Sequence, residues 1–237
     1  MTIDRRKFLG ITGASVAASI LAACDSRGPK SADRLLNYAE RKNEKLERLL
    51  LRHTSMDATI SGTRLAGAAL PSYFISKTVP MWNDAQRGQW TLEIGGMVDT
   101  PLKLTLPQLV ALPRMSERVN HYCVEGWTAV EQWTGVRLSD LARRAGVHKG
   151  AEYVDFISFD DGYHESWDID SAMHPQTVVA YGLDGHMLAP AHGAPARVYS
   201  PVKLGYKNTK YLTKIMFLPT RTGGYWSDEG YEWYGGI

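Results

Sequence analysis

Residues 121–127 read HYCVEGW, and residues 133–136 follow with WTGV. The thiol of Cys123 is the chemical centre of this stretch, because a thiolate is soft and polarizable and binds soft or high-valent metals. A histidine two residues away on one strand lies on the same face, and such a neighbour lowers the pKa of a thiol when it is charged. The stretch predicts a metal-binding or nucleophilic cysteine with His121 beside it.

The cysteine count narrows the kinds of site that Cys123 can build. The whole chain contains two cysteines, Cys24 and Cys123, so a zinc or iron–sulfur site made of several thiolates is excluded. A cysteine hydrolase stays open because a histidine elsewhere could serve as the base, although no local signature of those enzymes surrounds the thiol. An inert buried thiol and a thiol paired between chains also stay open.

Basic and aromatic residues cluster in the last fifth of the chain. HGAPAR stands at residues 192–197, GYK at residues 205–207, and the chain ends with GYW at residues 224–226 and GYEWY at residues 230–234. A guanidinium such as that of Arg197 is a planar fork for phosphate oxygens, and an ammonium such as that of Lys210 is a point charge. Both suit an anionic cofactor, although solvated strand charges and packed rings are the ordinary alternative.

Taken together, these segments resemble the molybdopterin-binding domain of the sulfite oxidase family, over about residues 71–237. The aromatic ending resembles a bacterial, exported subgroup of that family. The resemblance implies an α+β, sulfite-oxidase-type molybdopterin-binding fold with mixed or antiparallel sheets and short helices. It also implies an oxidoreductase with a Mo-molybdopterin cofactor. Cys123 matches the catalytic thiolate ligand of molybdenum, whose shell the pterin dithiolene and oxo groups complete.

The resemblance also implies which residues hold the cofactor. Arg197 and Lys210 match positions that bind the pterin and its phosphate, and His192 matches a hydrogen-bonding position. Ser158 falls where the methionine sulfoxide reductase group has a hydroxyl residue, and residues 72–76 match a segment that closes over the cofactor. The predicted cofactor-binding residues are Ser72, Ile75, Ser76, His121, Ser158, His192, Arg197, Asn208, Thr209 and Lys210.

Two departures from the sulfite oxidases bear on the substrate. Those enzymes follow the ligand cysteine with an arginine-containing segment, whereas this chain continues with VEGW at residues 124–127. They also have an arginine in the segment that matches residues 72–76, where this chain has Ser76. Arginines suit an anionic substrate. We therefore expect oxygen-atom transfer to or from a small, neutral, sulfoxide-like molecule. The alternatives are a sulfite dehydrogenase and a non-catalytic lipoprotein that keeps the fold as a binding or assembly module.

The first residues predict export and lipid anchoring. Residues 4–10 read DRRKFLG and precede a short apolar run, and residues 21–24 read LAAC. The segment at residues 4–10 resembles a twin-arginine signal, and the segment at residues 21–24 resembles a lipobox. The alternative is an ordinary signal peptide with a chance pair of basic residues. We expect a cleaved signal at residues 1–23, a tether at residues 24–31, and a periplasmic protein anchored through Cys24.

Further features predict where the enzyme works and with which partners. Asp25 after the anchoring cysteine resembles an inner-membrane retention signal. No haem-attachment Cys-x-x-Cys-His is present, so electrons must pass to or from another protein, and the family suggests a membrane cytochrome. A formal net charge of +2 gives no reason to expect nucleic acid as a partner.

Sequence patterns also predict individual elements. A helix is expected at residues 32–52 within an otherwise irregular N-terminal extension at residues 32–70, and the catalytic domain at residues 71–237. Trp90, Leu92 and Ile94 alternate as in a strand, Thr105 and Gln108 fit a capping box that opens a helix through Leu112, and Gly146 ends a helix that begins at Leu138. Further strands are expected at residues 153–159, 177–181, 196–199 and 211–217, with a hairpin turn at Asp184-Gly185. Without repeats or βαβ alternation, this pattern indicates an α+β architecture.

Overall fold

The computed structural model describes residues 33–51, 56–57 and 71–237. The chain divides into two compact units, Met1–Leu49 and Leu50–Ile237. The first contains helix α2 (Asp33–Leu50), which confirms the helix expected at residues 32–52. Within the described residues, no helix combines the length and the apolar composition that a membrane span requires. The expected signal peptide and tether, and nearly all of the irregular stretch up to residue 70, lie outside the described residues.

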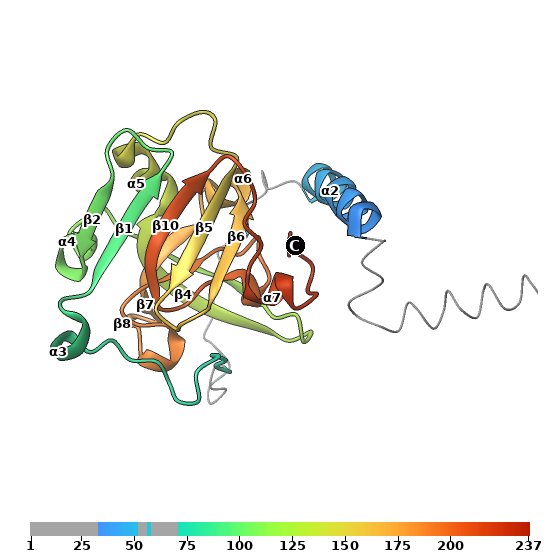
Figure 1. Cartoon of the computed structure of the whole chain (residues 1–237). Coiled ribbons are helices and arrows are strands. Elements are labelled where there is room, and N and C mark those ends of the chain that lie inside the picture. The colour runs from blue at the N-terminus through green and yellow to red at the C-terminus, as the bar shows by residue number, and fades with distance from the viewer. Residues whose placement is uncertain (1–32, 52–55, 58–70) are drawn as a thin grey trace, which may run out of the picture. The chain divides into compact units, whose positions relative to one another are not determined.

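The second unit is built on two sheets (Figure 1). In the first sheet the strands stand in the order β2-β1-β10-β5-β6. Strands β1 and β10 run parallel, and every other neighbouring pair in this sheet is antiparallel. The sheet is therefore mixed, as the sequence predicts. Its strands are β1 (Thr91–Gly96), β2 (Leu102–Thr105), β5 (Tyr153–Ser158), β6 (His164–Asp168) and β10 (Leu212–Leu218).

The second sheet is antiparallel and has the order β3-β4-β7-β8, with β9 also paired to β7. Gly135 lies at a register shift between β4 and β7, where a Cβ atom would stand 2.3 Å from the carbonyl oxygen of Val179. Only glycine allows the two backbones to approach this closely. The strands are β3 (Met115–Tyr122), β4 (Thr128–Arg137), β7 (Val178–Leu183), β8 (His186–Met187) and β9 (Arg197–Tyr199).

Short helices and turns connect the strands, and the sequence predicts two of these helices, α4 and α5. Thr105 forms the expected capping box with Gln108, but the helix ends at Val110 rather than Leu112. Gly146 ends α5 in the left-handed conformation. The helices of the second unit are α3 (Asp84–Arg87), α4 (Leu106–Val110), α5 (Leu138–Ala145), α6 (Ile169–Ala172), α7 (Tyr225–Asp228), η2 (Pro190–His192) and η3 (Gly205–Lys207).

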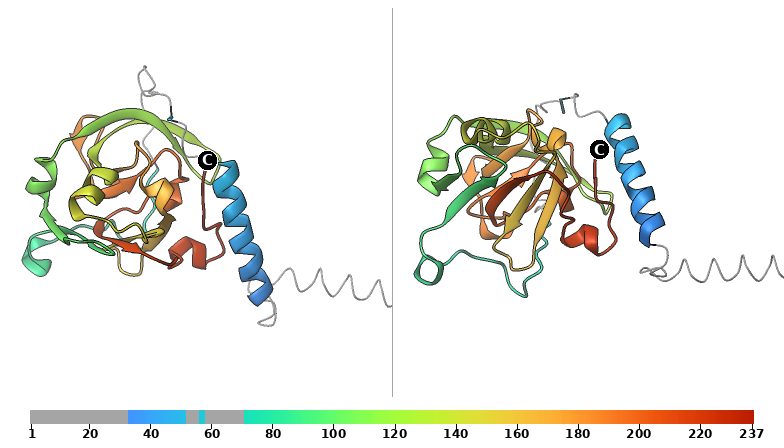
Figure 2. Two further views of the ribbon diagram at one scale, coloured as in Figure 1. Left: turned by 90° about the horizontal axis from the view of Figure 1, so that it is seen from above. Right: turned by 45° about the horizontal axis from the view of Figure 1, so that its top comes forward.

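The main hydrophobic core lies between the two sheets. Figure 2 shows the sheets from two further directions. Strand β7 contributes to it with Val179 and Tyr181, whereas Val178 and Ala180 face a second cluster around Trp133. Because successive side chains of a strand point to opposite faces, β7 is apolar throughout and buried on both sides. This double burial makes the second sheet a rigid support for the loops at its end.

The expected strands are confirmed to within two residues at each end, and the Asp184-Gly185 turn has positive φ at both residues, as a two-residue hairpin requires. The sequence analysis did not predict β2, β6 and β8, nor the long hairpin of β3 and β4. Along β3 only Val119 and His121 are buried, so the strand lacks the alternating apolar pattern that marks a half-buried strand.

Candidate active site

The turn of the β3–β4 hairpin holds Cys123. The two strands pair from Met115↔Gly135 to Tyr122↔Thr128, which leaves residues 123–127 as the connection. The backbone N–H of Cys123 donates to the carbonyl oxygen of Trp127 at 3.0 Å, and the N–H of Gly126 donates to the carbonyl oxygen of Cys123 at 3.0 Å. Gly126 has φ +88°, which favours glycine. These constraints fix a free, half-buried thiol at the end of the hairpin.

His121 does not activate this thiol by charge. Burial, with a smaller contribution from the charge of Arg197, lowers the pKa of His121 to about 3, so the ring is neutral near pH 7. It lies in an aromatic cluster, with ring centroids 5.7 Å from Trp127 and 5.8 Å from Tyr199. Burial raises the pKa of the Cys123 thiol, against hydrogen bonds from the backbone of Glu125 and Val124. The expectation that His121 lowers the pKa of the thiol is therefore wrong.

One pocket collects most of the predicted site residues. Its empty volume, counted out to open solvent, is about 1020 Å³. It joins the β3–β4 turn, the front segment, η2, β9 and the η3 region, which are far apart in the sequence. The predicted residues that line it are Ser72, Ile75, His121, Cys123, His192, Arg197, Asn208 and Lys210.

Three predicted residues do not line the pocket. The Ser158 hydroxyl accepts the backbone N–H of Asp160 at 2.9 Å, and the Ser76 hydroxyl donates to the Asp160 carboxylate. Both therefore hold Asp160, which itself lines the pocket. Thr209 is fully buried next to Asn208, and its hydroxyl has no hydrogen-bond partner in the part of the chain that the structure describes.

Two cations converge on one side of the pocket. The Arg197 guanidinium donates to the carbonyl oxygens of His192 at 3.2 Å and Asn208 at 2.9 Å. The Lys210 ammonium donates to the Ser72 hydroxyl and the Ala191 carbonyl oxygen, each at 3.3 Å. All of these acceptors are neutral. Among residues 33–51, 56–57 and 71–237, neither cation forms an ion pair with a carboxylate.

Burial disfavours the charged forms of both Arg197 and Lys210 in this corner of the pocket. Burial, together with the charge of Arg197, lowers the pKa of Lys210 to about 7. Burial also lowers the pKa of Arg197. An anion placed between the two would offset both effects, because an opposite charge nearby stabilises the protonated form. The corner therefore fits an anionic group such as a phosphate.

The front segment, residues 71–76, lies across the pocket and is bonded on three sides. Its Ser72 hydroxyl donates to the Ala191 carbonyl oxygen. The backbone N–H of Ile75 donates to Asp160 at 3.0 Å, and the Tyr73 hydroxyl donates to the Glu125 carboxylate at 2.8 Å. The last bond joins the segment directly to the turn that carries Cys123.

Several lining residues were not predicted from the sequence. Tyr211 has φ +59°, rare for a residue with a side chain, and its buried hydroxyl has no hydrogen-bond partner within the described residues. Burial raises its pKa to about 12, and the charge of Asp160 adds to the effect. Trp226 and Tyr231 also line the pocket, so aromatic residues near the end of the chain contribute to the site. The unpredicted lining residues with polar or aromatic side chains are Tyr73, Glu125, Trp127, Asp160, Tyr163, Tyr206, Tyr211, Trp226 and Tyr231.

The residues present fit a molybdenum–pterin group better than a metal held by protein alone. Within the described residues, no group of three His, Cys, Asp or Glu side chains converges to hold a metal ion. Cys123 is a single thiol at the pocket, so the other ligands of a bound metal must come from the cofactor. The cationic corner supplies the positive charge that an anionic pterin phosphate requires.

Comparisons with known proteins agree with this geometry. Residues 77–226 match the family described as oxidoreductase molybdopterin binding domain. The chain is 39% identical over 153 residues to the putative protein-methionine-sulfoxide reductase subunit YedZ1 of Azospira oryzae, covering 65% of this chain and 58% of that protein. It is 33% identical over 161 residues to the protein-methionine-sulfoxide reductase catalytic subunit MsrP of Ralstonia nicotianae, covering 62% and 49%. This chain thus spans about half to three fifths of these two relatives.

A solved structure supports the fold. The sulfane dehydrogenase SoxCD of Paracoccus pantotrophus superposes with a TM-score of 0.53 at 22% identity, over 56% of this chain and 39% of that one. At this identity the likeness concerns the fold alone. It agrees with the α+β architecture of mixed and antiparallel sheets with short helices.

Proposed function

Given that this chain belongs to the oxidoreductase molybdopterin binding domain family, a sulfite-oxidase-like family, we propose that Cys123 is the protein ligand of its molybdenum. We also propose that the enzyme reduces sulfoxides. Family membership makes the chain an enzyme, an oxidoreductase with a Mo-molybdopterin cofactor. The observation that carries the proposal is that the Cys123 thiol lines one pocket with two cations, Arg197 and Lys210, that form no ion pair with a carboxylate of the described residues.

The chain's own residues divide the work of holding the cofactor. Arg197 offers a planar fork and Lys210 a compact charge, so together they bind and orient an anionic phosphate or pterin edge. Hydroxyl and amide groups around them supply further hydrogen bonds. Of the residues predicted for this role, Ser72, Ile75, His121, His192 and Asn208 line the pocket, whereas Ser76 and Ser158 hold Asp160 and Thr209 is buried next to Asn208. When bound, the molybdenum–pterin group supplies a redox centre that changes by two electrons.

The proposed reaction removes the oxygen atom of a sulfoxide. The sulfur–oxygen bond breaks, two electrons and two protons are consumed, and the products are a thioether and water. The two relatives described above carry names that refer to methionine-sulfoxide reduction. The lining residues also favour a neutral substrate, because the two strong cations belong to the cofactor corner and no arginine remains to bind a sulfite anion.

Tyr211 is suited to orient the sulfoxide oxygen. Its hydroxyl has no other hydrogen-bond partner in the described chain, and its raised pKa keeps the proton on the oxygen at neutral pH. A protonated phenol donates a hydrogen bond. The front segment excludes water from the same space, since its three sets of bonds hold it over the pocket.

We also propose that the protein is exported by the twin-arginine route and anchored through Cys24 to the periplasmic side of the inner membrane. The signature residues at 4–10 and 21–24 support this proposal. The anchor would keep the enzyme near a membrane cytochrome that supplies the electrons. Replacing Cys24 with Ala should release active enzyme into the soluble periplasmic fraction, and retention of the variant in the membrane would contradict the anchor.

The test of the catalytic proposal measures metal and turnover together. Holoenzyme isolated with its cofactor should contain about one molybdenum atom per chain and should reduce sulfoxides with a reduced dye as electron donor. Cys123→Ala should remain folded and lose turnover by roughly a hundredfold or more, since even outer-shell changes at metal sites cost ten- to hundredfold. Oxidation of sulfite with a dye acceptor, without sulfoxide reduction, would support a sulfite dehydrogenase instead. A folded, exported protein without molybdenum would support a non-catalytic module.

A further inference from the structure

The C-terminal tail, residues 219–237, follows β10 and continues eleven residues beyond the family match, which ends at residue 226. We propose that this tail is the specificity wall of the pocket, that it selects sulfoxides with an apolar substituent larger than methyl, and that Glu165 is its positioning residue. The proposal rests on the proposed sulfoxide reductase function. It assigns a role to the aromatic residues that the tail contributes to the pocket lining.

The wall is a continuous set of aromatic rings. The ring centroids of Trp226 and Tyr231 are 5.0 Å apart, and those of Tyr231 and Tyr206 are 5.4 Å apart. Tyr225 lies 5.2 Å from Trp226 and stacks at 5.6 Å on Tyr163. Four of these five rings line the pocket directly, Tyr225 being the exception. Each ring therefore supports the next, so the wall can present an apolar face without being covered by other side chains.

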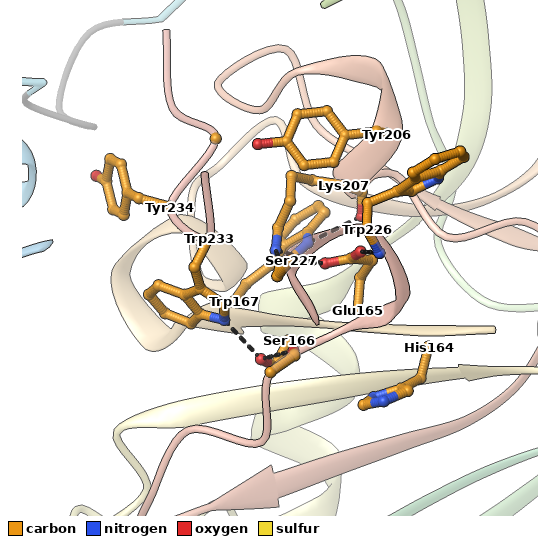
Figure 3. Close-up of polar contacts among 12 residues, drawn as sticks. His164, Glu165, Ser166, Trp167, Tyr206, Lys207, Trp226, Ser227, Trp233 and Tyr234 are labelled. Atoms are coloured by element: carbon orange, nitrogen blue, oxygen red, sulfur yellow. Dashed lines mark hydrogen bonds and ion pairs between the residues drawn. The ribbon is translucent and has the colours of Figure 1, made fainter. Parts of the chain in front are cut away.

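Glu165 on β6 fixes the start of the wall. Its side chain is fully buried, and its carboxylate accepts the backbone N–H of Trp226 at 3.0 Å and the Ser227 hydroxyl at 3.2 Å. The same carboxylate forms an ion pair with Lys207 at 2.5 Å. Lys207 follows Tyr206, so one carboxylate holds two separate parts of the aromatic wall in place, as Figure 3 shows.

The rest of the tail is bonded to the same two elements, β6 and the η3 region. The Trp233 indole N–H donates to the Ser166 hydroxyl at 2.8 Å. The Lys203 ammonium donates to the carbonyl oxygen of Tyr234 at 2.6 Å, and the N–H of Leu204 donates to the carbonyl oxygen of Gly235 at 2.8 Å. Together with the bonds of Trp226 and Ser227 to Glu165, these bonds hold the tail on both sides of Tyr231 in the sequence. The tail is therefore a fixed part of the pocket.

Gly224 shows how closely the tail approaches Glu165. A Cβ atom at residue 224 would stand 2.3 Å from a carboxylate oxygen of Glu165, and the two residues form an isolated β-bridge. Any larger residue would push the carboxylate away from the N–H of Trp226. The glycine before the GYW aromatic pair thus permits the contact that places Trp226 at the pocket.

Ring faces of this kind bind thioethers, sulfoxides and apolar groups through dispersion and sulfur–aromatic contacts. Dimethyl sulfoxide has only methyl groups to offer, so it gains little from contact with these rings. Methyl phenyl sulfoxide adds a ring that can stack on Trp226 or Tyr231. The wall therefore favours the larger molecule, and the ratio of kcat/KM for the two substrates measures its contribution.

The first experiment removes one ring from the wall. In holoenzyme, Tyr231→Ala should lower the ratio of kcat/KM for methyl phenyl sulfoxide to that for dimethyl sulfoxide by about tenfold, the effect of one aromatic pair. The change should appear mainly as a higher KM for the larger substrate, with molybdenum content retained. Trp82→Ala is a control at an aromatic residue outside this pocket and should leave the ratio unchanged. An unaltered ratio in Tyr231→Ala would overturn the proposal.

The second experiment tests positioning. Glu165→Gln keeps one oxygen, which can accept the Trp226 N–H, but replaces the oxygen that accepts from Ser227 and pairs with Lys207 by an NH2 group, so the ion pair is lost. A positioning role predicts a lower substrate ratio through KM, while kcat for the bound substrate is kept. A purely structural role would instead lower molybdenum content and kcat for both substrates alike, and that result would sink the assignment of Glu165.

A binding measurement separates this proposal from the proposed function. Calorimetric titration with methyl phenyl sulfide, the thioether product, needs no turnover, and its affinity should fall about tenfold in Tyr231→Ala. If the wild-type enzyme reduces no sulfoxide yet this difference is found, the proposed reaction fails and the wall stands. If sulfoxides are reduced but neither the affinity nor the substrate ratio changes, the wall fails alone.

Discussion

Lys207 and Lys210 lie three residues apart, the first fully buried and the second half-buried at the pocket, and their partners differ in charge. Lys207 pairs with the Glu165 carboxylate at 2.5 Å, whereas Lys210 donates only to a hydroxyl and a carbonyl oxygen, each at 3.3 Å. The first ammonium is already neutralised by its partner and stabilises the tail. The second keeps its field for an incoming anion. The comparison distinguishes a cation that is neutralised by a carboxylate from one that we propose to bind the cofactor.

The pKa values follow the same division. Burial lowers the pKa of Lys207 to about 8, although the Glu165 carboxylate opposes this effect. Burial and the neighbouring Arg197 lower the pKa of Lys210 to about 7. A bound anion would therefore stabilise the positive charge of Lys210 more than that of Lys207. Four predictions follow from treating Lys203 and Lys207 as anchors of the tail and Arg197 and Lys210 as the cofactor corner.

The largest effect is expected from breaking an anchor. Lys203 pairs with Asp168 at 3.0 Å, and both side chains are fully buried. Lys203→Met should lower the free energy of unfolding by about 3–5 kcal/mol, because it leaves the Asp168 carboxylate buried without its cation. Chemical denaturation of the cofactor-free protein measures this change. Lys214→Met removes an exposed pair with Glu93 and should cost less than about 1 kcal/mol. Equal losses in the two variants would show that burial does not distinguish these lysines.

The second prediction concerns the cofactor corner. Arg197→Lys keeps a positive charge but replaces the two-pronged contacts to His192 and Asn208 with a point charge. Cofactor affinity should fall by roughly ten- to hundredfold, as for other groups that orient a metal site. Molybdenum and pterin content after dialysis measures the loss. The cofactor-free protein should unfold close to the wild-type denaturant concentration, and a variant that retained full cofactor affinity would contradict the assignment.

These two regions also differ in how far the sequence predicts them. Cys123, Arg197 and Lys210 stand in short motifs whose chemistry can be read locally, and the structure brings them to one pocket. The anchors have no local signal, since Glu165 and Lys207 are forty-two residues apart and their pairing depends on how β6 meets η3. A charged residue in a sequence is expected at the surface. Its burial with a partner is a property of the tertiary fold.

The missed hairpin has a similar cause. Strand β3 buries only Val119 and His121, and its backbone forms contacts with distant parts of the chain. The backbone N–H of Asn120, for example, donates to the carboxylate of Asp57 at 2.9 Å, and the Tyr199 hydroxyl donates to the carbonyl oxygen of Asn120 at 2.8 Å. Such long-range polar contacts replace the apolar alternation by which a strand is recognised. Helix α5, which has a clear apolar stripe and a glycine stop, was predicted to the residue.

The third prediction uses pH to separate Lys210 from the anchors. Lys210 carries its charge below its lowered pKa of about 7 and loses it as the pH rises through that value. Binding of sulfate to the cofactor-free protein should therefore weaken above pH 7, by up to about tenfold per pH unit. Sulfate keeps its charge throughout, so the protein alone titrates. Lys210→Met should bind sulfate more weakly at pH 6 and with a flatter pH dependence. A slope that persists unchanged in the variant would assign the titration to another group.

The smallest effect is expected at an exposed bond of the front segment. The Tyr73 hydroxyl donates to the Glu125 carboxylate at 2.8 Å, but the Tyr73 side chain is largely in solvent. Water replaces a lost partner at such a site, so Tyr73→Phe should change the free energy of unfolding by less than about 1 kcal/mol. The segment keeps its buried contacts to Asp160 and Lys210, and the KM for sulfoxides should stay within about twofold. Substitution of the buried partner, Asp160→Asn, should have the larger effect on KM, because it weakens the bonds from both Ile75 and Ser76. If Tyr73→Phe and Asp160→Asn changed KM equally, the exposed bond of Tyr73 would stabilise the front segment as much as the buried bonds to Asp160. The contrast between buried and exposed contacts would then not apply to the front segment.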